Sequence, residues 1–171
     1  IIRAAIKRVE RVDLLDLGLR YFNIPVLNPK GEPRQQTQSE LIVLTEKYFG
    51  LWIDEMEMGA RILNATPHLF GGTHWKPITN REFEVILGNF ALRIGCNPVG
   101  FGIFTAREKL VKQFHSIHGG EPADDKNGQT LLNFRNGTLQ ISDNEELMRG
   151  FDKTDLLTYQ LPCEYDENAA C

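Results

Sequence analysis

The sequence predicts an α+β domain, with helices through its first half and short antiparallel hairpins among the later elements. Apolar residues recur at helical spacing in the first third of the chain and again around 80–118. The period changes to alternation near 68–78 and 131–141, on either side of the turn sequences Gly71-Gly72 and Asn136-Gly137. These changes of period are typical of helices combined with two β-hairpins.

Two helices are expected in the first third of the chain. Over residues 1–22, apolar side chains fall near helical spacing, with Arg and Glu between them. The proline-rich stretch 23–34 then predicts a loop, and a second helix is expected to begin near Thr37 or Ser39. The expected inner face of this helix consists of Leu41, Leu44, Tyr48, Leu51 and Trp52.

The middle of the chain carries signals for a hairpin and two further helices. The stretch "TPHLFGGTHWKPI" predicts two strands joined by a two-residue turn at Gly71-Gly72. The sequences "TNRE" at 79–82 and "TARE" at 105–108 both resemble capping boxes, each followed by an apolar stripe. Gly95 and Gly119-Gly120 supply the stop signals for these two helices.

The last part of the chain predicts a second hairpin and one more strand. The polar stretch at 119–130 indicates a loop. The hairpin at 131–141 is expected to have a type I′ turn, because Asn136 and Gly137 adopt positive φ at low cost. A final strand is predicted at 156–161, where Pro162 ends it.

Length and composition allow two domain organisations. The chain is either one continuous domain or a helical N-terminal segment over 1–65 followed by an α+β domain over 66–171. A hydrophobic share of 42% and a charged share of 25% are ordinary, so a core can form without disulfides or metal. Three widely spaced cysteines argue against a disulfide framework and predict a reducing, cytoplasmic location. No apolar run approaches the roughly 20 residues that span a bilayer, and no membrane partner is expected.

No motif in the sequence predicts catalysis or metal binding. The chain lacks a phosphate-binding loop, a nucleophile elbow and a zinc-binding HExxH helix. His115 and His118 lie three residues apart, and Asp124 and Asp125 follow, but the helix dipole alone favours histidine near a helix C-terminus. We therefore expect no catalytic residue, no metal ligand and no cofactor in this chain.

Contacts with DNA would have to come from a local basic surface, because the net charge of the chain is −4. The candidates are cations beside hairpin tips or on the polar face of a capped helix: Lys76, Arg81, Arg107, Lys109, Lys112 and Arg135. A solvated surface is the alternative role for these side chains. For Trp75 we expect a place in the core rather than base stacking.

Three stretches in the second half resemble a known family: "FGGTHWKPI", "NFRNGTLQI" and "LLTYQLPCEYDENAAC". The matching positions are Gly72, Thr73, Trp75, Asn136, Gly137, Leu139, Leu161, Pro162, Tyr165, Asp166 and Ala169. They resemble the domain that precedes the superfamily 3 helicase in phage, plasmid and poxvirus primase–helicases. The resemblance covers residues 68–171 and is indistinct over 1–65. Phe70-Gly71 stands where that family more often has Tyr-Asn, and a glycine still serves the turn.

This resemblance implies an accessory, collar-type domain that supports hexamer formation and DNA engagement by an ATPase lying beyond Cys171. The parent protein would be an ATP-dependent DNA helicase, and ATP and Mg²⁺ would bind to that ATPase rather than to this chain. The expected partners are DNA, bound weakly by the domain alone, further copies of the chain in a hexamer, and a primase domain or an initiator.

Two other functions stay open at this point. The chain could be a protein-interaction domain that recruits a primase or an initiator. It could also be a small cytosolic enzyme, with His68, His74, Asp54 and Glu55 meeting near the first hairpin. A pocket in which titratable side chains converge would favour the enzyme. Salt-dependent DNA binding would favour the helicase-associated domain over the protein-interaction domain.

Overall fold

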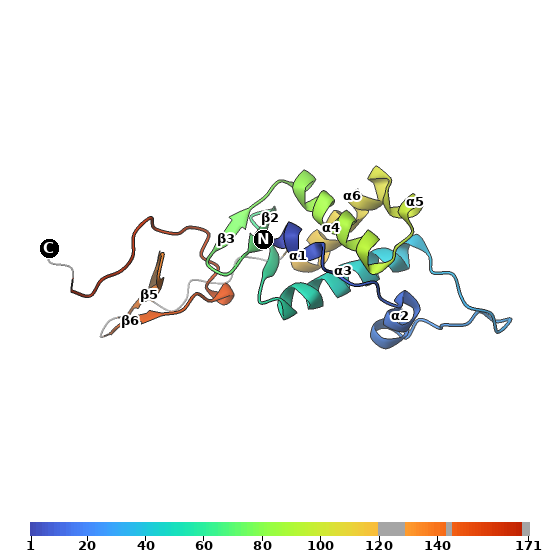
Figure 1. Ribbon diagram of the computed structural model, residues 1–171, viewed down its shortest axis with the longest axis horizontal. Helices are drawn as coiled ribbons and strands as arrows, with labels where there is room; N and C mark the ends of the chain where they lie inside the picture. Colours follow the sequence, from blue (N-terminus) through green and yellow to red (C-terminus); the bar gives the residue numbers. More distant parts are fainter. Residues whose placement is uncertain (120–128, 143–144, 169–171) are drawn as a thin grey trace.

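The computed structural model describes residues 1–119, 129–142 and 145–168. Figure 1 shows an elongated molecule in which the helices form one end and a three-stranded sheet lies beside them. A second three-stranded sheet and the C-terminal segment form the other end. All strand pairs are antiparallel, and the predicted α+β class is confirmed.

The helices are α1 (Ile2–Ile6), α2 (Leu14–Phe22), α3 (Gln38–Glu55), α4 (Asn80–Ile94), α5 (Pro98–Phe101) and α6 (Phe104–His118). Among the described residues, none of these helices is long and apolar enough to cross a membrane. The expectation of one helix over residues 1–22 is wrong, because two helices with a break between them occupy this range.

The break between α1 and α2 follows from a capping residue that starts the second helix. Asp13 is extended, and its carboxylate accepts hydrogen bonds from the backbone N–H groups of Leu15 and Asp16. Before this cap the chain runs beside α4, where the Val12 N–H donates to the Ile94 carbonyl at 3.1 Å. Val9 is buried in the same core as α1, so the apolar spacing continues across the break and hides it in the sequence.

Capping boxes begin two of the long helices. Thr79 with Glu82 caps α4 as predicted, and Thr37 with Glu40 forms a further capping box where only the start of α3 was predicted. Gly95 ends α4 in the left-handed region with φ of 114°, also as predicted. The box predicted at 105–108 is wrong, because α6 begins at Phe104 without a side-chain capping bond.

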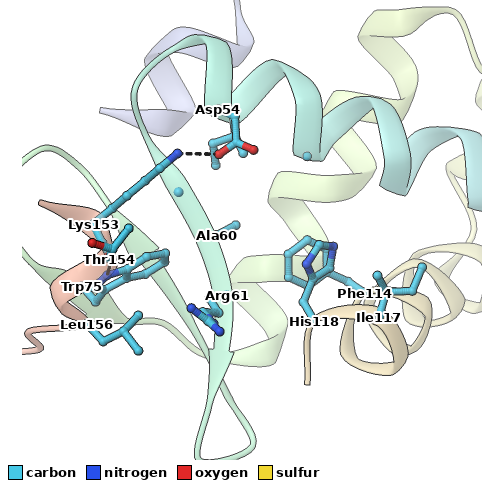
Figure 2. Close-up of a pocket in the computed structure, with 13 residues that line it drawn as sticks. Asp54, Ala60, Arg61, Trp75, Phe114, Ile117, His118, Lys153, Thr154 and Leu156 are labelled. Carbon is cyan, nitrogen blue, oxygen red and sulfur yellow. Dashed lines mark hydrogen bonds and ion pairs between the residues drawn. The ribbon is translucent and has the colours of Figure 1, made fainter. Parts of the chain in front are cut away.

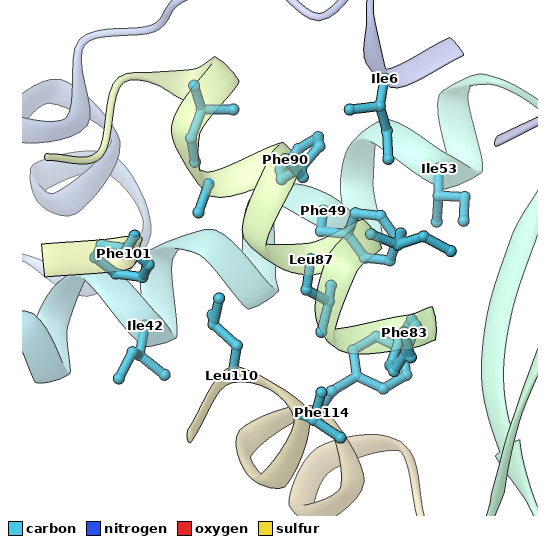
Figure 3. Packing of buried hydrophobic residues seen from close by; sticks show 14 of the residues in the cluster. Ile6, Ile42, Phe49, Ile53, Phe83, Leu87, Phe90, Phe101, Leu110 and Phe114 are labelled. Atoms are coloured by element: carbon cyan, nitrogen blue, oxygen red, sulfur yellow. The ribbon is translucent and has the colours of Figure 1, made fainter. Parts of the chain in front are cut away.

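The main core lies between α3, α4 and α6, with Phe49 at its centre (Figure 3). The rings of Phe83, Phe90 and Phe114 lie edge-on to Phe49, with centroids 5.1–6.3 Å away, and all four side chains are fully buried. Burying one such side chain stabilises the fold by about 1.5–3 kcal/mol. Edge-to-face pairing adds about 0.5–1.5 kcal/mol for each pair.

The inner face of α3 was predicted only in part. Leu44 is buried, and Leu41, Tyr48 and Trp52 are partly buried against the core, but Leu51 is 37% exposed. Ile42, Phe49 and Ile53, which were not selected, are buried instead. Apolar residues occur all round this helix, so their spacing alone does not determine which face turns inward.

The first sheet consists of β1 (Gly59–Leu63), β2 (Thr66–Phe70) and β3 (Trp75–Pro77) in that order. Its two-residue turn is Asn64-Ala65, where φ is 48° and 59°, as in a type I′ turn. Strands do flank Gly71-Gly72 as predicted, but the connection there has four residues, 71–74, rather than two. The sequence did not indicate the other turn, because alanine rarely adopts positive φ.

The second sheet consists of β4 (Thr130–Phe134), β5 (Gly137–Ile141) and β6 (Glu146–Arg149). The predicted hairpin is present, but its type I′ turn is wrong: Phe134 pairs with Gly137, and the turn residues Arg135 and Asn136 do not have positive φ. Gly137 is the first residue of β5, with φ of 151°. The strand predicted at 156–161 is also wrong, since this segment is extended without forming a ladder, and β6 was not anticipated.

Gly137 is required by the close approach of β6. A Cβ atom at this position would lie 2.4 Å from the Arg149 carbonyl oxygen and 2.8 Å from the Met148 Cε. We expect Gly137→Val to lower the free energy of unfolding by about 1–3 kcal/mol, from backbone strain and this contact. Urea unfolding measures the change. Gly150→Val is the matched control, because a Cβ at Gly150 meets no atom within 4 Å. Equal stability of the two variants would contradict this account.

Candidate functional site

The C-terminal segment 152–166 crosses both sheets and joins them. It begins with a short 3₁₀ helix, η1 (Lys153–Asp155), and continues in extended form. The Trp75 N–H donates to the Leu157 carbonyl at 2.8 Å, which attaches the first part of the segment to β3. The Leu161 N–H donates to the Asn133 carbonyl at 2.7 Å, which attaches the second part to β4. We call residues 152–166 the junction segment.

The amide of Asn133 connects three parts of the chain. Asn133 is fully buried, and its Nδ2 donates to the Thr73 carbonyl at 3.0 Å and to the Tyr159 carbonyl at 2.8 Å. Thr73 lies in the loop before β3, and Tyr159 lies in the junction segment. Its Oδ1 has no hydrogen-bond partner among the described residues. One side chain thus holds the second sheet, the first sheet and the junction segment together.

The end of the junction segment is bound by the hairpin turn. Asn136 Nδ2 donates to the Tyr165 carbonyl at 2.9 Å, and the Tyr165 N–H donates back to Asn136 Oδ1 at 2.9 Å. The Arg135 N–H donates to the Cys163 carbonyl at 2.9 Å. The Tyr165 ring lies 5.5 Å from that of Phe134. The Asn-Gly and Tyr-Asp sequences that carry the family resemblance therefore meet in space.

Ion pairs attach η1 to its surroundings. Arg149 of β6 pairs with Asp155 at 2.7 Å, and the Asp155 side chain is only 3% exposed. The hydrogen bond that Arg149 donates to this carboxylate raises the pKa of the Arg149 guanidinium. On the other side, Lys153 pairs with Asp54, at the end of α3, at 2.6 Å. The 3₁₀ helix is thus linked both to the second sheet and to the helical end of the molecule.

A pocket of about 430 Å³ lies where the junction segment meets α3, α6 and β1 (Figure 2). Lys153 reaches across it to Asp54, and the indole of Trp75 donates to the Lys153 carbonyl at 2.9 Å. On the α6 side, His118 stacks on Phe114 with ring centroids 4.1 Å apart, and its Nε2 lies 2.7 Å from the Glu46 carboxylate. Trp75 is 4% exposed, so its expected place in the core is confirmed.

Three of the four residues proposed for an enzyme, His68, His74 and Asp54, bond to partners outside that group. His68 is buried, with Nδ1 2.9 Å from the Thr66 carbonyl, and His74 bonds to the neighbouring Thr73 hydroxyl at 2.9 Å. Burial, with a contribution from Lys76, lowers the pKa of His74. Asp54 is engaged with Lys153. No convergence of nucleophile and base is seen among these side chains.

The described residues contain no group of three or more His, Cys, Asp and Glu side chains that could hold a metal ion. His115 Nε2 lies 3.2 Å from Asn80 Oδ1, and burial lowers the pKa of His115. His118 is engaged with Glu46. Asp124 and Asp125 lie outside the described residues, as does Ala169 of the family resemblance.

The six cations considered for DNA contact are distributed over β3, the helices α4 and α6, and the turn of the second sheet. Two of them pair with carboxylates on their own helix: Arg81 with Glu84 at 2.9 Å, and Lys112 with Glu108 at 2.7 Å. Arg107 donates to the Phe101 carbonyl at 3.2 Å and packs against α4 at Gly88. The others, Lys76, Lys109 and Arg135, are exposed and have no ion-pair partner in the described part of the chain.

The residues that hold the junction segment were found only in part from the sequence. Asn136, Leu161 and Tyr165 were selected through the resemblance, but Asn133 and Lys153 were not. One signal was present for Asn133: it is a polar side chain inside the strand sequence "TLLNF". A buried polar side chain must find partners, and this position could have been singled out for that reason.

Comparison with known proteins finds a family match in the second half of the chain. A family model described as "D5 N terminal like" matches residues 105–171, and this domain is found in phage and plasmid primase–helicase proteins. The matched range contains α6, the second sheet and the whole junction segment. No match to a curated protein or to a solved structure was found.

We expect Asn133→Ala to lower the free energy of unfolding by about 2–4 kcal/mol, because two partly buried carbonyl groups, those of Thr73 and Tyr159, lose their donor. Asn136→Ala, at the exposed turn, should cost only about 0.5–1.5 kcal/mol. Urea unfolding gives both values, and hydrogen exchange locates the effect. Asn133→Ala should increase exchange over residues 156–161 and in β3, whereas Asn136→Ala should affect residues 163–166 alone. The reverse order of stabilities would show that the buried amide is not the main connection.

Proposed function

We propose that the chain is an accessory and assembly domain of a phage- or plasmid-type replicative primase–helicase. In this role it supports hexamer formation and DNA engagement by a superfamily 3 ATPase that follows it. The observation that carries the proposal is the junction segment, which lies within the matched family range and is bound to both sheets and to α3.

The binding of the junction segment bears directly on this role. A flexible linker leaves the domains at its two ends free to reorient. Residues 152–166 instead have backbone bonds to β3 and β4, a buried amide contact and two ion pairs. A domain attached through such a segment starts from a fixed position relative to the helices, and preorganisation of this kind lowers the entropy cost of assembling a ring.

Within this proposal, ATP and Mg²⁺ belong to the ATPase, since this sequence has no phosphate-binding loop. The isolated chain binds DNA weakly, in the range of about 10⁻⁴–10⁻⁶ M that is typical of non-specific contacts. A ring of copies multiplies these contacts and binds DNA more tightly. The proposed setting is the cytoplasm, where replication proteins of this type work.

A second candidate function is recruitment of a primase domain or an initiator protein. It is favoured by apolar side chains exposed around the corner between α5 and α6, where Val99 is 79%, Ile103 49% and Phe104 59% exposed. Neighbouring exposed apolar residues are typical of protein-interaction surfaces. The same exposed apolar residues are also suited to contacts between copies of the chain in a ring.

The test is to express the chain together with the sequence that follows it in its gene. We expect this longer protein to hydrolyse ATP and to form rings, measured by native mass spectrometry, whereas the 171-residue chain does neither. Asn133→Ala should reduce ring formation at a given concentration, because the junction segment loses its buried contact. Arg20→Ala, on the surface of α2, is the control and should leave ring formation unchanged.

Three results would contradict the proposal. The first is ATP hydrolysis by the 171-residue chain that a point substitution in it abolishes. The second is a following sequence without a phosphate-binding loop. The third is normal ring formation by a folded Asn133→Ala protein. If Phe104→Ser leaves rings intact but prevents capture of a primase domain, the recruitment function is supported instead.

A further inference from the structure

A set of cations lies along the N-terminal segment and α4, apart from the six cations that the sequence predicted for DNA contact. The first twelve residues contain four cations, Arg3, Lys7, Arg8 and Arg11, and one acidic residue, Glu10. On the side toward α4, Arg3 pairs with Glu82, while Lys7 has no ion-pair partner among the described residues.

A groove of about 740 Å³ follows the contact between α1 and α4. Arg3 and Lys7 line one side, and Asn89 and Arg93 of α4 line the other. Its remaining lining residues are the apolar Ile6, Ile86 and Leu92. We call this the α1–α4 groove. Lys7 and Arg93 are exposed and have no ion-pair or hydrogen-bond partner among the described residues.

The cations follow the whole length of α4. Arg3 reaches Glu82 in the first turn of α4, and the Val12 N–H bonds to Ile94 in its last turn. Arg11 packs against Gly95 directly beyond that end. The path from residue 82 to residue 94 is about 18 Å long at 1.5 Å per residue. Along the axis of duplex DNA, where each strand carries one phosphate about every 3.4 Å, this length spans roughly five phosphates of one strand.

The helix dipole explains part of this charge but not all of it. The C-terminal end of α4 favours cations, which accounts for Arg93 and Arg11. It does not account for Arg3 and Lys7, which lie along the side of the helix. Arg3 does pair with Glu82 at 3.2 Å, but both side chains are about half exposed or more, and such pairs are weak and easily exchanged. Glu82 keeps its capping bonds to Thr79 without this arginine.

We propose that the α1–α4 groove binds the phosphate backbone of nucleic acid through Arg3, Lys7 and Arg93, with Arg11 extending the row of cations beyond the groove at Gly95. The choice of nucleic acid as the ligand rests on the proposed function. A linear row of cations complements a linear row of phosphates, and the exposed Asn89 amide adds a neutral donor of the kind that contacts phosphate and sugar oxygens. Among the described residues, no aromatic side chain on which a base could stack lines the groove, so the proposed contact is to the backbone and is independent of sequence.

The test uses the 171-residue chain and fluorescein-labelled DNA, single-stranded and duplex, with anisotropy recorded at several salt concentrations. Lys7→Glu/Arg93→Glu should weaken binding at least about tenfold and lower the salt slope by about 1.4–1.8, according to the strand type. Lys109→Glu/Lys112→Glu on α6 is the matched control, because it changes the net charge equally. It should leave affinity and slope close to those of the unchanged chain.

Folding is controlled with the neutral pair Lys7→Gln/Arg93→Gln, which should also weaken binding while keeping the thermal midpoint of the unchanged chain. Equal losses of DNA affinity in the groove and α6 variants would overturn the proposal, because binding would then depend on the overall charge of the chain. A larger loss in the α6 variant would place the interface there instead. The proposal also fails if the unchanged chain shows no binding at about 10⁻⁴ M protein in low salt.

Self-association is the remaining alternative, and sedimentation of the same variants without DNA detects it. If the groove variants change the oligomeric state but not DNA binding, the groove holds an acidic surface of another copy and the proposal is wrong. Ring formation by the longer protein tests the proposed function separately. If the longer protein forms rings but the groove variants bind DNA as tightly as the unchanged chain, the groove proposal is wrong and the proposed function is not affected.

Discussion

Hydrogen bonds from one buried amide, that of Asn133, connect parts of the chain that share little apolar surface. Among the described residues of the second sheet, Leu139 is the only buried hydrophobic side chain. Three antiparallel strands with so small an apolar face do not have a well-determined position by themselves. The contacts of Asn133 with Thr73 and Tyr159 supply this position, and they are directional where apolar packing is not.

The helical end of the molecule depends on different physics. Phe49 and the three phenylalanines around it give this end a dense apolar core, and the first sheet adds a small cluster of Leu63, Phe70 and Trp75. Trp75 belongs to both systems, because its ring is buried beside Phe70 while its indole N–H bonds to the junction segment. The junction segment is therefore supported at one end by a rigid core and at the other by polar contacts. Its extended part also covers an edge of β4, which would otherwise present unpaired backbone groups.

Charge is arranged unevenly over this framework. On α4 and α6, glutamates one turn from Arg81 and Lys112 neutralise these cations locally. Along the N-terminal segment, cations recur every four residues at Arg3, Lys7 and Arg11, and one carboxylate, that of Glu82, reaches them from α4. A chain of net charge −4 can in this way carry a local positive surface, since fields over short distances depend on nearby charges rather than on the total.

The sequence by itself determined the features that depend on neighbouring residues. The start of α3 near Thr37, the capping box at Thr79, the stop at Gly95 and the positions of both predicted hairpins follow from side chains within a few residues of each other. The family resemblance likewise identified Asn136 and Tyr165, although not that they touch. The break before α2 and the Asn64-Ala65 turn were not predicted, because the local sequence signals for them are ambiguous.

Only the tertiary structure decided the contacts between distant residues. Asn133 and Thr73 are 60 positions apart, and Lys153 and Asp54 are 99 apart, so no periodicity relates them. The need for glycine at position 137 comes from the carbonyl of Arg149 on another strand rather than from the turn itself. The grouping of Arg3 and Lys7 with Arg93 depends on how α1 packs on α4. Burial and charge pairing are properties of the assembled surfaces, and they arise only when segments far apart in sequence have packed together.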